Sequence, residues 1–276
     1  MALIFLMVVP WAAAQRNEEV TEPRSDLLRK PAGSRPLGVA ENDVASHVRS
    51  MFSAVAPRYD RANHLLSAAT DIYWRHQAAR RIARELPARA KALDICCGTG
   101  DMSFALARRL RAGQTLWAAD FSHAMLLEAQ RKAARRKQAG PLGWIEADAL
   151  QLPWRDDSLD AVLTGYGFRN LAGYEAGLRE FYRVLKPGGR LYILEFFRPE
   201  LPVLKPLYEW YFSHILPRLG HWLTGRRAAY EYLPRSVAHF ATVRELAVWM
   251  RQAGFADVGF RRLTGGITAL HWGVKQ

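Results

Sequence analysis

The chain is poor in cysteine and in acidic side chains. Only two of its 276 residues are cysteines, and Cys96 and Cys97 are adjacent, a spacing that does not suit a structural disulfide. A disulfide scaffold is therefore excluded, and a reducing compartment is expected. Asp and Glu number 26 against 39 Lys and Arg, which gives a formal net charge of +13. This excess predicts an anionic partner: nucleic acid, a phosphorylated small molecule or an anionic membrane surface.

Long apolar runs are also missing. The most apolar stretch, residues 1–14, is too short to cross a bilayer as a helix and contains Pro10. It lacks the positive start of a secretory signal, which favours an extension or a weak interfacial anchor over a cleaved export signal. The stretch up to Asp43 mixes charge and proline without an apolar period. We therefore predict an apolar segment and disordered linker over 1–43 and one folded domain over 44–276.

Beyond residue 44, helical and β-like segments alternate along the chain. Helical spacing marks 44–66, with a break at Pro57, and later 101–111, 122–138 and 174–185, with short apolar runs between them. This alternation is typical of βαβ units in a parallel sheet. The predicted fold class is α/β: a Rossmann-like, seven-stranded, mostly parallel sheet with helices on both faces. N-terminal helices precede it, and a helical insertion comes before the last helix and hairpin.

The sharpest local motif is LDICCGTGD, a strand that runs into a glycine turn and then a helix. Glycines let the backbone approach a ligand closely, and a helix N-terminus favours negative charge. A dinucleotide fingerprint needs a third Gly or Ala where Ser103 stands, which disfavours NAD. Asp120 ends the next strand, where its carboxylate can accept hydrogen bonds from the ribose hydroxyls of an adenosine.

Asp148 and Ala149 follow the third strand at the same edge of the sheet. Asp148 can accept a hydrogen bond from the exocyclic amine of adenine, and the small Ala149 lets the ring lie flat. Adenosine without a pyrophosphate fits this pattern, which predicts S-adenosyl-L-methionine as the cofactor and no metal. The alternative is that such carboxylates cap helices without touching a ligand, as Asp101 and Ser122 are placed to do.

Several long segments, in the same order, resemble the class I S-adenosylmethionine-dependent methyltransferases, and within them the ubiquinone and menaquinone biosynthesis C-methyltransferases. The segments include MFSAVAPRYDRANHLLS, LDICCGTGD, GFRNLAGYEAGLREFYRVLKPGGRLYILEF, YEYLPRS and LTGGITALHWGVK. The resemblance covers the chain from about residue 44 to its end. It implies that the cofactor-binding residues are Gly98, Thr99 and Gly100 at the methionine and ribose end, Asp120 at the ribose, and Asp148 and Ala149 at the adenine.

The resemblance further implies methyl transfer to a ring carbon of a quinol. The catalytic candidates are Arg169 and Asn170, at the end of the fourth strand. The family arginine is proposed to act through an activated water. Because arginine stays protonated, we expect Arg169 to stabilise the quinolate oxygen while water takes the ring proton. Secondary candidates are Tyr59, Asp60, Tyr166 and His271.

Residues 198–236 form an insertion rich in aromatic and aliphatic side chains, with basic residues between them. Such a segment is typical of a lid over an apolar ligand, although core helices with solvated basic faces are the alternative. We expect a cytoplasmic enzyme, peripheral at the inner face of the cell membrane, that methylates the polyprenylated quinol demethylmenaquinol to menaquinol. Dual specificity, with the benzoquinol ring of ubiquinone biosynthesis as a second substrate, stays open, as does a homo-oligomer.

The net positive charge would also suit RNA or DNA. However, the Asp/Asn-Pro-Pro-Tyr/Phe tetrapeptide usual for amino-group methylation is missing after the fourth strand, where the sequence reads GYGF. We therefore expect no nucleic-acid partner and assign the charge to attraction by an anionic membrane surface. An RNA methyltransferase is the more distant alternative, and a non-catalytic membrane-binding module is disfavoured by the intact cofactor motif.

Overall fold

The computed structural model describes residues 18–19, 33, 43–136, 142–202, 204–216, 218–219, 222 and 227–276. The predicted apolar segment 1–14 lies outside these residues, and so does most of the predicted linker. The helix α2 (Val44–Val55) begins where the folded domain was expected to begin. The division of the chain at residue 43 otherwise stays a prediction.

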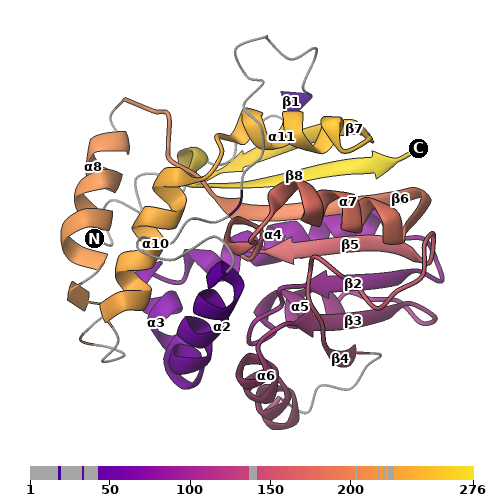
Figure 1. Ribbon diagram of the computed structural model, residues 1–276, viewed down its shortest axis with the longest axis horizontal. Coiled ribbons are helices and arrows are strands. Elements are labelled where there is room, and N and C mark those ends of the chain that lie inside the picture. Colours follow the sequence, from indigo (N-terminus) through magenta and orange to yellow (C-terminus); the bar gives the residue numbers. More distant parts are fainter. Residues whose placement is uncertain are drawn as a thin grey trace.

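A twisted sheet forms the centre of the described chain (Figure 1). Its strands are β1 (Glu18–Glu19), β2 (Lys91–Ile95), β3 (Thr115–Asp120), β4 (Leu142–Glu146), β5 (Leu159–Gly165), β6 (Leu185–Phe196), β7 (Phe255–Leu263) and β8 (Thr268–Lys275). Their spatial order is β1-β7-β8-β6-β5-β2-β3-β4. Strands β4, β3, β2, β5 and β6 pair in parallel, whereas β8 is antiparallel to both β6 and β7. The predicted seven-stranded α/β sheet is confirmed; the two-residue β1, paired with β7, was not predicted.

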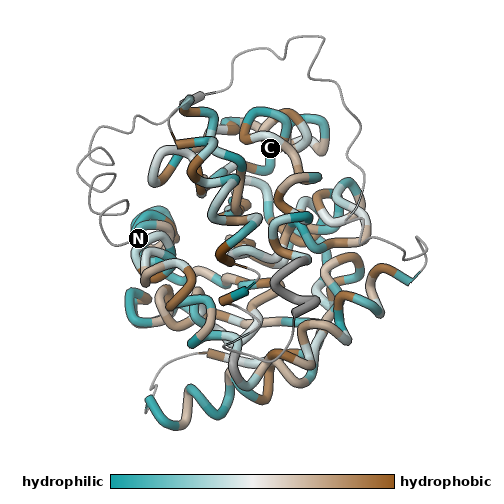
Figure 2. Tube along the Cα trace, turned by 90° about the vertical axis from the view of Figure 1, so that its left-hand side faces the viewer, coloured by the Kyte–Doolittle hydropathy of each residue, from teal (hydrophilic) through white to brown (hydrophobic). Residues whose placement is uncertain are grey.

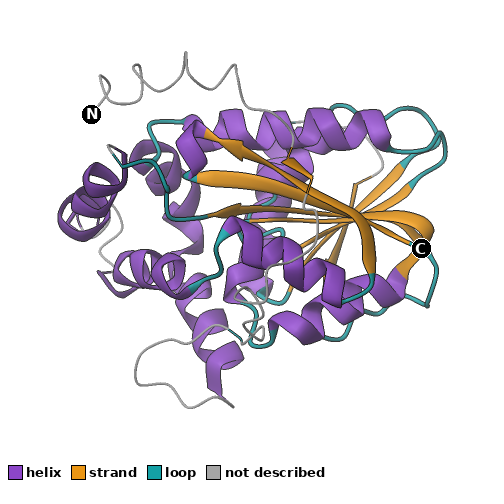
Figure 3. Ribbon diagram, turned by 90° about the horizontal axis from the view of Figure 1, so that it is seen from above, coloured by secondary structure: helices purple, strands orange, loops and turns teal. Residues whose placement is uncertain are grey.

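Helices cover both faces of this sheet (Figure 3). The main ones are α4 (Thr70–Glu85), α5 (Asp101–Ala107), α6 (His123–Arg135), α7 (Tyr174–Val184) and α11 (Val243–Gln252). Alternate residues of a strand face opposite layers: Val162 of β5 packs in the core under α7 and α11, and Leu163 packs in the core under α4 and α5. Burial on both faces explains why the central strands are almost continuously apolar.

Two predicted element ends differ from the structure. The helix predicted to reach residue 111 ends at Ala107, and the chain then turns through Gly113, whose φ is +87°. The Lys-Pro-Gly-Gly sequence of 186–189 favours a turn, but the segment lies inside β6, where the register against β5 shifts between Leu159 and Ala161. The bulge lets the chain change direction without ending the strand.

A second group of helices gathers beyond the carboxyl ends of the parallel strands (Figure 1). It comprises α2, α3 (Tyr59–Leu66), α8 (Leu204–Trp210), the π-helical turn η6 (Tyr211–Ile215) and α10 (Arg227–His239). Hydrophobic and hydrophilic residues alternate along their turns, as expected for amphipathic helices (Figure 2). The hydroxyl of Tyr211 donates to the carbonyl of Leu66 at 2.7 Å, which joins the insertion to α3. None of the helices that the structure describes has the length and apolarity needed to cross a membrane.

Trp74 anchors α4 on the sheet. Its side chain is buried, and its indole Nε1 donates to Thr264 Oγ1 at 2.8 Å, in the turn between β7 and β8. Its ring also meets the ring of Phe196 edge-on, with 5.9 Å between centroids. Because α4 has one end at the carboxyl edge of the sheet, this anchor sets the position of every side chain that the helix places there.

Replacing Trp74 with Ala should lower the free energy of unfolding by about 3–5 kcal/mol, because the change leaves a large cavity and an unpaired Thr264 hydroxyl. Trp222→Ala is the matched control, because Trp222 is 78% exposed and its loss should cost less than about 0.5 kcal/mol. Urea denaturation followed by far-ultraviolet circular dichroism measures both. Equal losses in the two variants would contradict the anchoring role.

Candidate active site

A cleft of about 930 Å³ lies at the carboxyl ends of β2, β3, β4 and β5. Five of the six predicted cofactor-binding residues line it: Gly98, Thr99, Asp120, Asp148 and Ala149. Gly100 is not among the lining residues. Its φ is +85°, and a Cβ there would lie 2.8 Å from the ring of Trp144, so the turn onto α5 explains why this residue is glycine.

The carboxylate of Asp120 joins the loops that follow β2 and β3. Its Oδ2 accepts the backbone N–H of Gly98 at 2.8 Å, and its Oδ1 accepts that of Ser122 at 2.9 Å. Burial raises the pKa of Asp120 to about 6, although both N–H groups oppose this rise. A carboxylate has about four acceptor positions, so both oxygens can still accept hydroxyl groups from a ligand. Asp148 is exposed at the same edge, and its Oδ1 accepts the N–H of Leu150 at 2.9 Å.

Ser103, which replaces the third glycine of a dinucleotide fingerprint, holds a buried carboxyl group. Its hydroxyl donates to Asp94 Oδ2 at 2.5 Å, and both side chains are fully buried. Burial raises the pKa of Asp94 to about 7. Burial also raises the pKa of the Cys96 and Cys97 thiols. Cys97 is buried, whereas Cys96 is partly exposed, and both line the cleft. The departure from the fingerprint therefore has a structural cause.

A second cavity, of about 1380 Å³, opens between α3, α4, α8 and α10. Aromatic and aliphatic side chains form most of its wall. Phe52, Tyr59, Arg75 and Tyr166 line this pocket and the cleft alike, so the two cavities meet at these four side chains. Tyr166 has a φ of +65°, a conformation that costs free energy in any residue with a side chain, and its ring stacks on Phe196 at 4.3 Å.

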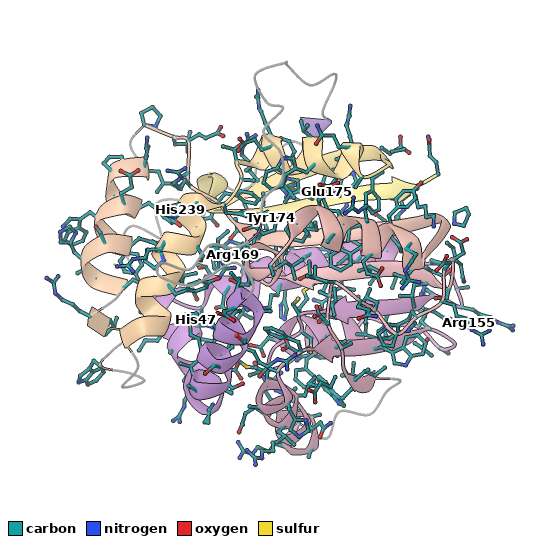
Figure 4. All side chains as sticks on the ribbon, viewed as in Figure 1. His47, Arg155, Arg169, Tyr174, Glu175 and His239 are labelled. Atoms are coloured by element: carbon teal, nitrogen blue, oxygen red, sulfur yellow. The ribbon has the colours of Figure 1, made fainter. Side chains whose placement is uncertain are left out.

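Arg169 lies in the wall of the apolar pocket, in the centre of the molecule near α10 (Figure 4). It is 4% exposed, and its Nη1 pairs with Glu195 Oε1 at 2.5 Å and donates to the carbonyl of Tyr166 at 2.7 Å. Its Nε donates to Ser236 Oγ at 3.3 Å. The fully buried Glu195 also accepts the backbone N–H of Arg169 at 3.2 Å. The charge of Arg169 is therefore compensated inside the protein.

Asn170 faces the other cavity. It lines the cleft, and its amide nitrogen lies 3.4 Å from the carbonyl of Tyr166. Its Oδ1 accepts the hydroxyl of Tyr232 on α10 at 2.9 Å. The short 3₁₀ turn η5 (Phe168–Asn170) thus directs two consecutive side chains into two different cavities. The two predicted catalytic residues are brought together, but only Arg169 borders the apolar pocket.

A cluster of charges ties α3 to the glycine loop. Thr99 Oγ1 donates to Asp60 Oδ1, and Lys132 Nζ lies 2.5 Å from Asp60 Oδ2 and 2.8 Å from Asp101 Oδ1. His64 Nε2 lies 3.5 Å from the other oxygen of Asp101. The cluster fixes the helix that borders the apolar pocket against the loop that borders the cleft. The secondary candidate Asp60 therefore holds α3 against the glycine loop through Thr99 and Lys132.

His271 stands apart from both cavities. It is fully buried between the rings of Phe197 and Phe260, and its Nε2 bonds to the carbonyl of Val243 at 2.8 Å. Burial lowers its pKa to about 4. This histidine therefore stays neutral in the core, and it is not part of the site. Among the described residues, no group of three or more His, Cys, Asp or Glu side chains could hold a metal ion.

Sequence reasoning missed three charged residues of the site: Asp71, Arg75 and Glu195. Asp71 and Arg75 are four residues apart on α4, a spacing that normally indicates an exposed helix pair. Glu195 lies at the carboxyl end of β6, the kind of position that identified Asp120, so a lone carboxylate in an apolar strand was a signal that could have found it. For Asp71 and Arg75, only the packing of α4 against the sheet edge turns the side chains inward, and the sequence gives no signal.

Comparison with known proteins identifies the family to which the chain belongs. Residues 39–275 match the ubiE/COQ5 methyltransferase family. The demethylmenaquinone methyltransferase of Thermus thermophilus is 44% identical over 223 residues, which is 81% of this chain and 99% of that protein. The enzyme of the same name from Lactiplantibacillus plantarum is 39% identical over 235 residues, 85% of this chain and 98% of that one.

Solved structures agree on the fold. An S-adenosylmethionine-dependent methyltransferase from Thermotoga maritima superposes with a TM-score of 0.59 at 20% identity, covering 83% of this chain and 100% of that chain. The [4+2]-cyclase SpnF also reaches 0.59, at 16% identity, covering 88% of this chain and 98% of that chain. The cyclase shows that this fold alone does not fix the reaction. The match over residues 39–275 does fix the family: the chain belongs to the ubiE/COQ5 methyltransferases.

Proposed function

We propose that this protein is an S-adenosylmethionine-dependent C-methyltransferase that converts demethylmenaquinol to menaquinol. One observation carries the proposal: a cleft with carboxylates at its strand ends opens into a large apolar pocket, and the two share four lining side chains. A polar cofactor and a lipid-like ring substrate can therefore meet at one point. The names of the relatives identify which ring is methylated in those proteins, and we extend that substrate to this chain.

The cleft suits the cofactor chemically. Asp120 would accept the ribose hydroxyls, Asp148 the adenine amine, and Gly98 leaves open space for the methionine end, since no atom lies within 4 Å of a Cβ built there. Ala149 would border the flat ring. When bound, S-adenosylmethionine supplies a methyl group on a sulfonium, an electrophile strong enough that positioning and charge placement account for most of the acceleration.

The apolar pocket would hold the naphthoquinol ring and the first part of its prenyl chain. Ring methylation needs an electron-rich carbon, which a quinol provides when one hydroxyl is ionised. Arg169, a cation in the pocket wall, would stabilise the electron-rich ring through a hydrogen bond to one of its two oxygens, and Asn170 would hold the turn that links pocket and cleft. Water takes the ring proton after transfer, because Arg169 is paired with Glu195 and stays protonated. The aromatic walls exclude other water from the reacting carbon.

The purified protein should methylate reduced demethylmenaquinone, and Arg169→Ala should lower turnover by roughly 10²–10³ or more while leaving cofactor affinity nearly intact. That variant leaves Glu195 buried without its positively charged partner, so its free energy of unfolding should also fall by about 3–5 kcal/mol. The double variant Arg169→Gln/Glu195→Gln removes both charges and separates the two effects. Arg183→Ala, which breaks the distant pair with Glu180, is the control. Turnover assays measure the methylation rate, and calorimetry measures the affinity for S-adenosylmethionine. Near-normal turnover in the double variant would refute the role of Arg169.

Cofactor affinity should weaken as pH falls through about 6, because protonation of Asp120 removes the negative charge that strengthens hydrogen bonds from the ribose hydroxyls. Asp120→Asn should bind the cofactor roughly 10- to 100-fold more weakly at neutral pH. In that variant the affinity should change much less between about pH 5 and 6.5 than it does in the wild type. Calorimetric titration measures the cofactor affinity of both proteins over this pH range. If the affinity of the variant depends on pH as steeply as that of the wild type, Asp120 is not the titrating group.

We further propose that the enzyme works at an anionic membrane surface, with residues 198–236 as the substrate lid. The support is a set of exposed apolar side chains on α3, α4 and the insertion, namely Leu65, Ile72, Tyr73, Trp210 and Trp222. Trp210 is 52% exposed and also lines the apolar pocket. Lys205 and Arg218 are exposed on the same insertion. Tryptophan and basic residues together are typical of segments that lie at a lipid interface.

Arg218→Glu should weaken binding to vesicles that contain phosphatidylglycerol by at least about fivefold, since each basic residue near such a surface contributes about 1 kcal/mol. Arg155→Glu makes the same charge change at the opposite end of the molecule (Figure 4) and should change binding far less. Sedimentation with vesicles measures both, with pure phosphatidylcholine as the uncharged reference. If both variants lose affinity equally, net charge rather than this face determines binding.

A further inference from the structure

Arg75 is the charged side chain at the point where the two cavities meet. Of the four described residues that line both cavities, Phe52, Tyr59 and Tyr166 are aromatic, and Arg75 is the one cation. Methyl transfer brings the cofactor and the accepting carbon together, so it has to occur where the cavities are continuous. A group on the substrate next to the accepting carbon must therefore come close to Arg75.

Arg75 is held in place before any ligand arrives. Its Nη1 donates to Asp71 Oδ2, and its guanidinium lies 4.9 Å from the centre of the Tyr166 ring. Asp71 is itself fixed by His64 Nδ1 at 2.8 Å and by the hydroxyl of Ser67 at 2.6 Å. Burial opposes ionisation of Asp71, but these hydrogen bonds and the Arg75 cation outweigh it and hold its pKa well below its usual range. The ion pair thus stays formed at every working pH.

The two cations of the apolar pocket differ in how many of their donors the protein uses. Arg169 donates from Nη1 and Nε to a carboxylate, a carbonyl and a hydroxyl. Arg75 donates from Nη1 to Asp71 within the described part of the chain. Both carboxylates also accept other donors: Asp71 from His64 and Ser67, and Glu195 from the backbone N–H groups of Arg169 and Phe196. The two cations therefore differ in how many N–H groups are left for a ligand, and Arg75 has more of them. Arg75 therefore has more capacity to bind an oxyanion.

We propose that Arg75 binds the quinolate oxygen adjacent to the carbon that is methylated, and that Asp71 positions it. The inference rests on the proposed function and refines it, because a 1,4-quinol has two oxygens. The oxygen beside the reacting carbon faces the junction and Arg75, and the oxygen across the ring faces Arg169, which lines the apolar pocket alone. The hydroxyl proton of the bound quinol passes to water, and the oxyanion that remains is stabilised by the guanidinium.

Two ring analogues separate charge recognition from ring recognition. 2-Hydroxy-1,4-naphthoquinone is an anion at neutral pH, and its methyl ether, 2-methoxy-1,4-naphthoquinone, is neutral. Arg75→Met should weaken binding of the anion roughly 10- to 100-fold while leaving affinity for the ether within about twofold. Arg75→Lys keeps the positive charge but not the planar guanidinium, so its affinity for the anion should fall less than that of Arg75→Met. Calorimetry at pH 7 measures the affinity of the wild type and of both variants for each analogue.

The matched control is Arg81→Met on the same helix. Arg81 also pairs with a carboxylate four residues along, Glu85 at 2.9 Å, and its guanidinium also lies over an aromatic ring, that of Trp272 at 3.5 Å. It lines neither cavity. Arg81→Met should bind both analogues as the wild type does, and S-adenosylmethionine affinity reports whether each variant keeps its cleft intact.

The outcomes are distinct. Selective loss of the anion in Arg75→Met, with the ether and the cofactor still bound, supports the proposal. Wild-type affinity for the anion in that variant, or equal loss of anion and ether, overturns it while leaving the methyltransferase assignment intact. If the wild-type protein binds the cofactor but neither naphthoquinone, the naphthoquinol substrate itself is wrong, and the role of Arg75 falls with it.

Discussion

An apolar pocket can hold a cation only when a buried carboxylate compensates it, and this constraint organises the whole site. Leaving one partner of such a pair alone in the interior costs several kcal/mol. Glu195 on β6 meets the requirement for Arg169, and Asp71 on α4 meets it for Arg75. The carboxylate of one pair therefore comes from the sheet, and the carboxylate of the other comes from the N-terminal helices. The substrate pocket exists only when these two layers are packed together.

The same packing couples the two cavities. Asp60, Thr99, Lys132 and Asp101 hold α3 against the glycine loop, so a ligand that orders this loop also steadies one wall of the pocket. On the other side, the turn that carries Arg169 and Asn170 places one side chain in each cavity. The cleft and the apolar pocket thus share a continuous framework and are not two independent sites, an arrangement that would favour alignment of reacting atoms.

The sequence was most informative where function depends on the end of a strand. Glycine turns and carboxylates at successive strand ends predicted the sheet, and five of the six cofactor-binding residues predicted from them line the cleft, because parallel strands bring their carboxyl ends to one edge. Gly100 matched the motif for another reason, the close approach of Trp144. Glu195 also stands at a strand end and could have been found in this way, whereas Arg75 could not, since only the angle at which a helix packs decides whether such a side chain faces solvent or a pocket.

The left-handed backbone at Tyr166 has a consequence for how this protein can change. A glycine there would relieve about 1–3 kcal/mol of backbone strain, but it would remove a buried ring that stacks on Phe196, at a cost of about 3–5 kcal/mol. Packing therefore holds the strained backbone in place, and the ring that borders both cavities is kept by the stability of the fold as well as by its position. A substitution that relaxes the backbone at this residue would loosen the wall between the two cavities at the same time.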